Sequence, residues 1–194
     1  FNGGRDRASG DLKHFSYTGY VARKFWGRNV DLWSGTSAPL THTIFFRYAD
    51  ILLMYAEAAN EIGGPAYTLP GANMSAVQAL NKVRERIMMP GVHSRYLASK
   101  ETFRERIKNE RAVELYLEGK RFFDLSRWGD AHKMQHRQLY GVDLTENAGR
   151  PTGYNISRTA LPVVTLTFEQ KHYKWPIPLT DALMFEEFKQ NPGW

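Results

Sequence analysis

Three glutamates at intervals of four residues are the first candidates for chemistry in this sequence: Glu110, Glu114 and Glu118. In a helix this spacing places the three carboxylates on one side, with neighbouring Cβ atoms about 6 Å apart. Separations of about 5–9 Å occur between the two carboxylates of glycosidase active sites. The spacing alone therefore leaves an acid–base pair open.

The basic residues along the same segment favour a structural role instead. Opposite charge keeps a carboxylate ionised, whereas a general acid needs a raised pKa. Charges on an apolar helix at residues 44–62 must also find partners, because an unpaired buried charge costs several kcal/mol. We therefore predict no catalytic residue, and an ion-pair network between helices made of Arg47, Glu57, Glu110, Glu114, Glu118, Arg121, Asp124 and Arg127.

Other catalytic and metal chemistry has little support. His132 and His136 have the spacing of two helical metal ligands, but the glutamate of the zinc-protease motif and a third ligand are missing. The sequence has no Gly-x-Ser-x-Gly motif and no phosphate-binding glycine loop. Its lack of cysteine excludes a disulfide scaffold, a thiolate metal site and a cysteine nucleophile. We predict neither a metal nor a cofactor.

The aromatic residues are the better candidates for ligand binding. Sugars stack on Trp and Tyr rings that loops of a rigid scaffold expose, while polar side chains bind the hydroxyl groups. Four aromatic residues lie in or beside expected loops, and ordinary packing is the alternative for each. The predicted binding residues are Trp33, Trp26, Tyr140 and Tyr154.

The net charge of +6 at pH 7 raises the question of a nucleic-acid partner. The lysines and arginines are scattered along the chain and often stand beside carboxylates, and no nucleic-acid-binding motif is present. We therefore predict no nucleic-acid partner.

The elements that must position these residues are mainly helical. Amphipathic patterns predict helices over residues 44–62, 73–88 and 99–129, the second with Asn73 as N-cap and the third with a bend or a close contact at Gly119. The first two form a hairpin of the length of a tetratricopeptide unit. Smaller elements are expected as a helix at 130–140, strands at 19–26 and 163–168, long loops at 27–42 and 141–161, an extended segment at 175–178 and a short helix at 181–189.

Five ordered blocks of the sequence carry a family likeness: residues 46–59, Leu80–Arg86, Glu110–Trp128, Lys174–Pro178 and Gln190–Trp194. Together they resemble the C-terminal portion of the SusD/RagB family of Bacteroidetes outer-membrane lipoproteins. Trp128, Trp175 and Trp194 belong to these blocks, and we assign them structural roles.

The resemblance implies a mainly α fold, in which tetratricopeptide-like helical hairpins combine with a few short strands and long loops. It also implies a lipid-anchored protein on the cell surface that serves as a lid on a SusC-like TonB-dependent transporter in the outer membrane. Family members are longer and begin with a lipoprotein signal, so we expect residues 1–194 to form a single region, the C-terminal part of such a domain, without the N-terminal half and the anchor.

The sequence thus predicts a non-enzymatic, surface glycan-binding component of a nutrient-uptake complex. The alternative is a helical scaffold that docks a protein partner or binds peptides rather than glycans. A glycoside hydrolase is a third and more distant possibility.

Overall fold

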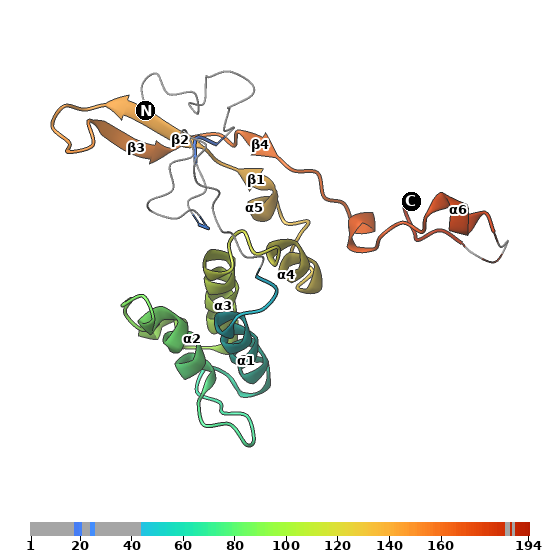
Figure 1. Cartoon of the computed structure of the whole chain (residues 1–194), viewed down its shortest axis with the longest axis horizontal. Helices are drawn as coiled ribbons and strands as arrows, with labels where there is room; N and C mark the ends of the chain where they lie inside the picture. Colours follow the sequence, from blue (N-terminus) through green and yellow to red (C-terminus); the bar gives the residue numbers. More distant parts are fainter. Residues whose placement is uncertain (1–17, 21–23, 26–43, 185–186, 188) are drawn as a thin grey trace, which may run out of the picture. The chain divides into compact units, whose positions relative to one another are not determined.

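The computed structural model describes residues 18–20, 24–25, 44–184, 187 and 189–194 (Figure 1). The chain divides into two compact units: a helical unit, Phe25–Phe123, and a mixed unit formed by Phe1–Lys24 and Asp124–Trp194. The expectation that residues 1–194 form one functional region stays a prediction.

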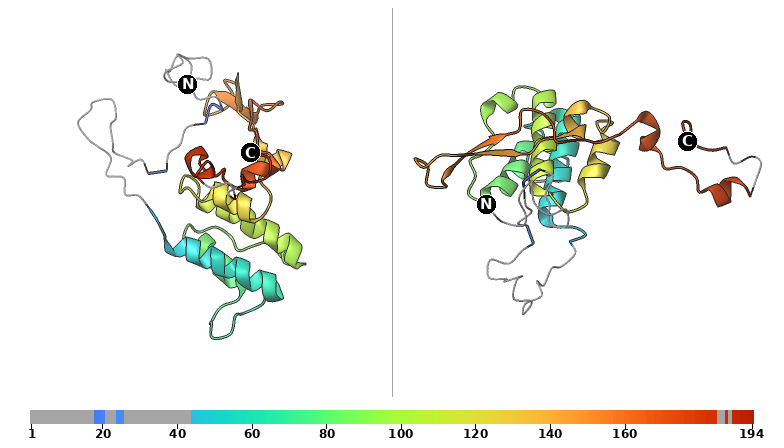
Figure 2. Two further views of the ribbon diagram at one scale, coloured as in Figure 1. Left: turned by 90° about the vertical axis from the view of Figure 1, so that its right-hand side faces the viewer. Right: turned by 90° about the horizontal axis from the view of Figure 1, so that it is seen from above.

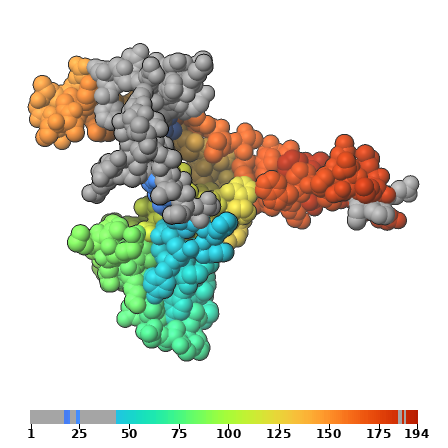
Figure 3. Space-filling model, in the orientation of Figure 1, coloured from blue at the N-terminus to red at the C-terminus, as the bar shows by residue number. Residues whose placement is uncertain are grey.

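The described part of the helical unit contains α1 (Tyr48–Gly63), α2 (Ala76–Glu85) and α3 (Lys100–Glu114), with a short 3-10 helix, η1 (Ser94–Tyr96), before α3. Helix α1 packs against both α2 and α3, so these segments lie side by side in every view (Figures 1 and 2). Their shared core contains the fully buried side chains of Leu53, Leu80, Phe103 and Ile107. In the space-filling view, the segments of α1 and α2 lie in direct contact (Figure 3). The predicted helical hairpin is therefore present.

Local hydrogen bonds define the end of α1 and the start of α2. The amide of Gly64, whose φ is +89°, donates to the carbonyl of Asn60 and ends α1. Ser75 begins α2 with a reciprocal capping box, in which its hydroxyl accepts from the amide of Gln78 and its amide donates to the Gln78 side chain. The prediction of Asn73 as the N-cap was therefore wrong, because Ser75 has the glutamine three residues later that completes the box.

The expected continuous helix over residues 99–129 is also wrong. Helix α3 ends at Glu114, and α4 (Arg121–Arg127) begins after a turn in which Leu117 and Gly119 have φ values of +62° and +71°. A Cβ atom on Gly119 would meet no atom within 4 Å, so this glycine supplies a left-handed backbone conformation and not a close contact. The apolar residues of the segment are therefore divided between α3, the turn and α4.

The residues of the mixed unit that the structure describes form short helices and two small antiparallel sheets. Its elements after α4 are α5 (Met134–Arg137), β1 (Gln138–Leu139), β2 (Val142–Glu146), β3 (Tyr154–Arg158), β4 (Val164–Thr165), η2 (Gln170–Tyr173) and α6 (Leu179–Ala182). Strand β1 pairs with β4, and β2 pairs with β3 in a register that places Leu144 opposite Ile156. The predicted helix at 130–140 is reduced to the single turn α5, and the expected terminal helix begins earlier, at Leu179.

The prediction of a long loop over residues 141–161 was wrong, because β2 and β3 form a hairpin there. The strands do alternate, with Val142 and Leu144 in one and Tyr154 and Ile156 in the other. The intervening polar residues, and the exposure of most of both strands, made this alternation weak. Of the strand expected at 19–26, the structure describes residues 19, 20, 24 and 25, and none of them is in a strand. The loop expected at 27–42 lies outside the described residues.

Candidate functional site

Helix α3 and the turn that follows it carry the three glutamates first considered for chemistry. Glu110 is 6% exposed and accepts hydrogen bonds from Arg84, at 2.8 Å, and from Arg106. Arg84 also donates to the carbonyl of Pro90 through Nε, at 2.8 Å. Glu110 therefore connects α3 with α2 through a buried ion pair.

Arg47, immediately before α1, contacts the other two glutamates. Its Nε atom lies 2.9 and 2.8 Å from the two carboxylate oxygens of Glu118, and its Nη atoms donate to the carboxylate and the carbonyl of Glu114. Burial alone would lower the pKa of Arg47, but the hydrogen bonds to Glu118 and Glu114 outweigh it and raise this pKa above its usual value. The guanidinium joins the start of α1 to the end of α3 and the turn beyond it.

A buried ion pair also lies between α1 and α3. Asp50 on α1 accepts from Arg111 on α3 at 3.0 Å, and its second carboxylate oxygen lies 3.2 Å from Nζ of Lys120. Asp50 and Arg111 are both almost fully buried. These contacts add to those of Arg47 in fixing α1 against α3.

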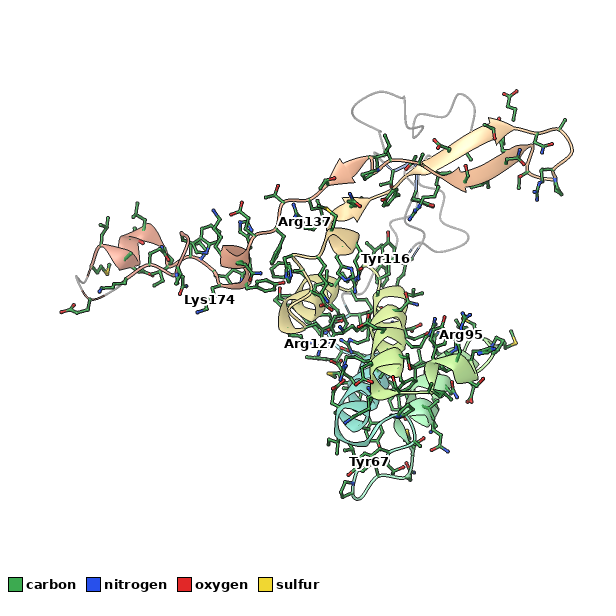
Figure 4. All side chains as sticks on the ribbon, turned by 180° about the vertical axis from the view of Figure 1, so that it is seen from behind. Tyr67, Arg95, Tyr116, Arg127, Arg137 and Lys174 are labelled. Atoms are coloured by element: carbon green, nitrogen blue, oxygen red, sulfur yellow. The ribbon has the colours of Figure 1, made fainter. Side chains whose placement is uncertain are left out.

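The remaining residues of the predicted network, Glu57, Arg121, Asp124 and Arg127, lie on α1 and α4. Arg127 lies at the end of α4 (Figure 4). It pairs with Asp124 of the same helix, and its Nη2 atom lies 2.9 Å from a carboxylate oxygen of Asp124. Glu57 lies on α1 and Arg121 begins α4, and both interact with other residues. The structure thus brings Arg47, Glu114 and Glu118 together, and it places Glu110 in a separate cluster with Arg84 and Arg106.

Of the four aromatic residues predicted to bind ligand, Trp26 and Trp33 lie outside the described residues. Tyr140 follows β1, and the guanidinium carbon of Arg158 lies 4.0 Å from the centre of its ring. Tyr154 begins β3 and pairs with Glu146. Both tyrosines are half-buried, and Arg158 covers one ring face of Tyr140, so this tyrosine has at most one face for stacking.

Sequence reasoning missed the exposure of Trp175. This residue is 74% exposed and precedes Pro176 in an extended segment after η2. Packing does not explain a tryptophan with so much of its surface in contact with water. The flanking proline was the available signal, because a residue before proline is held in an extended conformation outside helices.

The last residues of the chain bind the backbone of the segment that carries Trp175. The indole N–H of Trp194 lies 3.0 and 2.9 Å from the carbonyls of Lys171 and Lys174. Asn191 donates to the carbonyl of Trp175 at 2.7 Å, and the Gln190 side chain binds both backbone groups of Ile177 at 2.8 Å. Two sequence blocks separated by more than ten residues thus form one structural piece.

A pocket of about 450 Å³ lies beside this piece, and its lining residues all belong to the mixed unit. Its polar lining side chains are His132, Gln170, Lys171, Tyr173 and Lys174. The Nδ1 atom of His132 lies 2.8 Å from the hydroxyl of Tyr173, which also accepts the backbone N–H of His132 at 3.2 Å. The pocket therefore has basic and uncharged polar groups in its wall.

Metal binding and membrane crossing have no structural support in the described part of the chain. The described residues contain no cluster of three or more metal-binding side chains. Their helices are also all too short or too polar to span a lipid bilayer.

Comparisons with known proteins agree on one family. The family model that matches residues 6–194 is that of the SusD family. SusD-like protein P25 of Formosa agariphila is 40% identical over 114 residues, which cover 57% of this chain and 19% of that protein. SusD-like protein P38 of the same organism is 36% identical over 97 residues, covering 47% of this chain and 18% of the relative.

Solved structures give the same result. A SusD-like protein of Bacteroides fragilis matches with a TM-score of 0.60 and 30% identity, over 79% of this chain and 26% of its own. A second protein of that organism, described as SusD-like and carbohydrate-binding, matches with a TM-score of 0.54 and 27% identity, over 76% of this chain and 28% of its own. The fold is accordingly mainly helical with tetratricopeptide-like hairpins, as predicted.

The matches span about a fifth of the length of the curated relatives and about a quarter of the solved structures. Within this chain, the family model extends over nearly all residues, including the ion-paired helices and the clamped C-terminal piece. The chain therefore belongs to the SusD family.

Proposed function

We propose that the protein captures carbohydrate at the cell surface as the binding component of a nutrient-uptake complex, and that it does so without catalysis. The observation that carries this proposal is the family match over residues 6–194. One matched structure is that of a SusD-like carbohydrate-binding protein, which supports the ligand class. The proposed partner is a SusC-like TonB-dependent transporter in the outer membrane, with this protein lipid-anchored beside it.

The exposed aromatic side chains of the mixed unit fit this role. Trp175 is largely exposed, and its backbone is held on both sides: the indole of Trp194 donates to the carbonyl of Lys174, Asn191 donates to the carbonyl of Trp175, and the Gln190 side chain accepts from the amide of Ile177. A rigidly held ring loses little conformational entropy when a sugar stacks on it. Trp175 is therefore our first candidate for a stacking platform among the described residues.

One observation favours the second candidate function, a helical scaffold that docks a protein. Phe45, Phe46 and Tyr48 at the start of the helical unit are 75%, 74% and 65% exposed. Neighbouring large apolar side chains at a surface are typical of protein–protein contacts. The two functions are compatible if the helical unit binds the transporter while loops bind the glycan.

Titration of the full-length protein against a panel of neutral and acidic polysaccharides tests the proposal. We expect binding to at least one glycan, no release of reducing sugar, and a loss of about fivefold or more in affinity for Trp175→Ala, which corresponds to about 1 kcal/mol. Phe45→Ala removes an equally exposed aromatic ring from the helical unit and serves as the matched control.

Three outcomes would count against the proposal or part of it. Absence of binding to every glycan, together with binding to peptides or to a transporter alone, would favour the docking alternative. Release of reducing sugar would restore the glycosidase hypothesis. If Trp33→Ala weakens binding and Trp175→Ala does not, the stacking platform is at the site that the sequence predicted.

A further inference from the structure

The positive charges in the wall of the pocket beside η2 are partnered differently from the buried arginines of the helical unit. In the helical unit the buried arginines Arg84 and Arg111 contact carboxylates directly, at 2.8 and 3.0 Å. Lys174, in contrast, forms no ion pair with the residues that the structure describes. Lys171 has one carboxylate nearby, that of the exposed Glu169 at 3.5 Å. The pocket wall therefore carries positive charge that the described residues compensate only weakly.

The other polar groups of the wall suit an anion as well. Gln170 brings an amide that can donate hydrogen bonds, and His132 and Tyr173 bring an imidazole and a hydroxyl that contact each other at 2.8 Å. The described residues that line this pocket include no carboxylate. An anionic group in the pocket would thus meet ammonium groups and hydrogen-bond donors without a repelling charge in the wall.

The backbone that carries the lysines is held in place before any ligand binds. Trp194 binds the carbonyls of Lys171 and Lys174, and the ammonium of Lys171 lies 5.3 Å from the centre of the Trp194 ring. Lys174 follows η2 (Figure 4) and is exposed, and it is one of the residues that line the pocket. Such prior ordering of a charged wall lowers the entropy cost of binding.

We propose that this pocket binds the carboxylate or sulfate group of an acidic saccharide, an inference that rests on the proposed glycan-binding function. Its volume of about 450 Å³ is within the usual range for small-ligand sites. Lysine ammonium groups bind such anions as point charges, so they accept the planar carboxylate and the tetrahedral sulfate alike. The saccharide ring then meets the amide and hydroxyl groups of Gln170 and Tyr173.

The test uses three probes with one backbone: dextran, carboxymethyl-dextran and dextran sulfate of equal length, titrated against the full-length protein at low salt. We expect Lys174→Gln to weaken binding of at least one acidic probe about fivefold, the effect of losing one exposed charge pair, and to leave dextran binding unchanged. The probe that loses more affinity identifies the bound group as carboxylate or sulfate. Half-molar salt should reduce the difference, because it screens exposed charges.

Two variants control for folding and for net charge. Lys174→Arg keeps the positive charge and should keep most of the affinity. Lys189→Gln removes the same charge from an exposed position outside the lining of the pocket, so it should have a much smaller effect. Equal losses in Lys174→Gln and Lys189→Gln would overturn the proposal, because the binding would then depend on net charge and not on this pocket.

Other results separate this inference from the proposed function. Binding of glycans with no effect of Lys174→Gln on either acidic probe would overturn the pocket assignment and leave glycan capture intact. Absence of binding to all glycans, neutral and acidic, would overturn both. Single-stranded DNA that binds as tightly as dextran sulfate, and loses the same affinity in Lys174→Gln, would overturn the assignment to a saccharide.

Discussion

Substitution of Glu110 by glutamine tests whether the glutamate row is structural. The change keeps the shape of the side chain and removes its charge from a position that is 6% exposed. Arg84, at 2.8 Å and nearly as buried, then loses the carboxylate that compensates it. Removing one partner of a buried ion pair costs about 3–5 kcal/mol, because the other charge remains without compensation.

Two features of the site reduce this cost. Arg84 keeps its hydrogen bond to the carbonyl of Pro90, and Arg106, the second partner of Glu110, is partly exposed and can be solvated by water. We therefore expect Glu110→Gln to lower the free energy of unfolding by about 2–3 kcal/mol. For a folding unit of about 150–250 residues, that is a decrease in Tm of about 4–12 °C.

The assay is urea denaturation followed by circular dichroism, with glycan titration of the folded variant. Glu105→Gln is the matched control on the same helix, because the carboxylate of Glu105 is largely exposed and pairs with Lys108 at 3.1 Å. Loss of that surface pair should cost less than about 1 kcal/mol. Replacing Arg84 and Glu110 together by Met and Leu should recover part of the stability lost in Glu110→Gln.

Two results would refute this reasoning. If Glu110→Gln changes stability no more than Glu105→Gln, the buried pair does not hold α2 to α3. If stability is unchanged and ligand binding is lost, the glutamate belongs to a functional site, and the structural prediction for the row is wrong.

Two further predictions concern other contacts. The hydrogen bond from Arg104 lowers the pKa of the Glu61 carboxyl below its usual value. A carboxyl whose pKa is lowered on folding stabilises the fold above the pKa of the unfolded chain, and this contribution is lost as the pH falls through the lowered pKa. In a pH series of thermal unfolding, the stability difference between the protein and Glu61→Gln should therefore be complete at neutral pH and shrink as the pH falls below the usual pKa of a glutamate. Gly193 has a φ of +92°, and an added Cβ would lie 2.9 Å from Cβ of Lys171. Gly193→Ala should therefore destabilise the local structure of the C-terminal piece by about 1–2 kcal/mol. We expect this change to speed hydrogen exchange of the Ile177 amide about tenfold. An unchanged exchange rate would show that the C-terminal clamp forms without this conformation.

Short-range interactions explain what was predictable from the sequence. The helix expected at 44–62 is present as α1, Tyr48–Gly63, because the Gly63-Gly64-Pro65 segment ends it locally. The hairpin of α1 and α2 also follows from amphipathic patterns within each helix, since the buried stripes fix which faces meet. The family resemblance rests on such local blocks and is confirmed over nearly the whole chain.

The errors occurred where the local signals were in conflict or weak. Glu110 to Arg127 has helical spacing throughout, yet the left-handed residues Leu117 and Gly119 divide it into α3 and α4. Residues 141–161 contain glycine and proline typical of loops, yet the pairing of β2 with β3 forms a hairpin. Both strands lie within this segment, but most of their residues are exposed, so the alternation of apolar and polar residues is too weak to distinguish a hairpin from a loop.

The sequence by itself determined that the charged residues of the helices needed partners, because burial of an unpaired charge is costly at any position. Only the tertiary structure decided which partners they have: Arg47 contacts Glu114 and Glu118, whereas Glu110 pairs with Arg84, a residue outside the predicted network. The same holds for the pocket. Lys171 and Lys174 have no distinctive spacing, and they become neighbours of His132 through the packing of segments about forty residues apart.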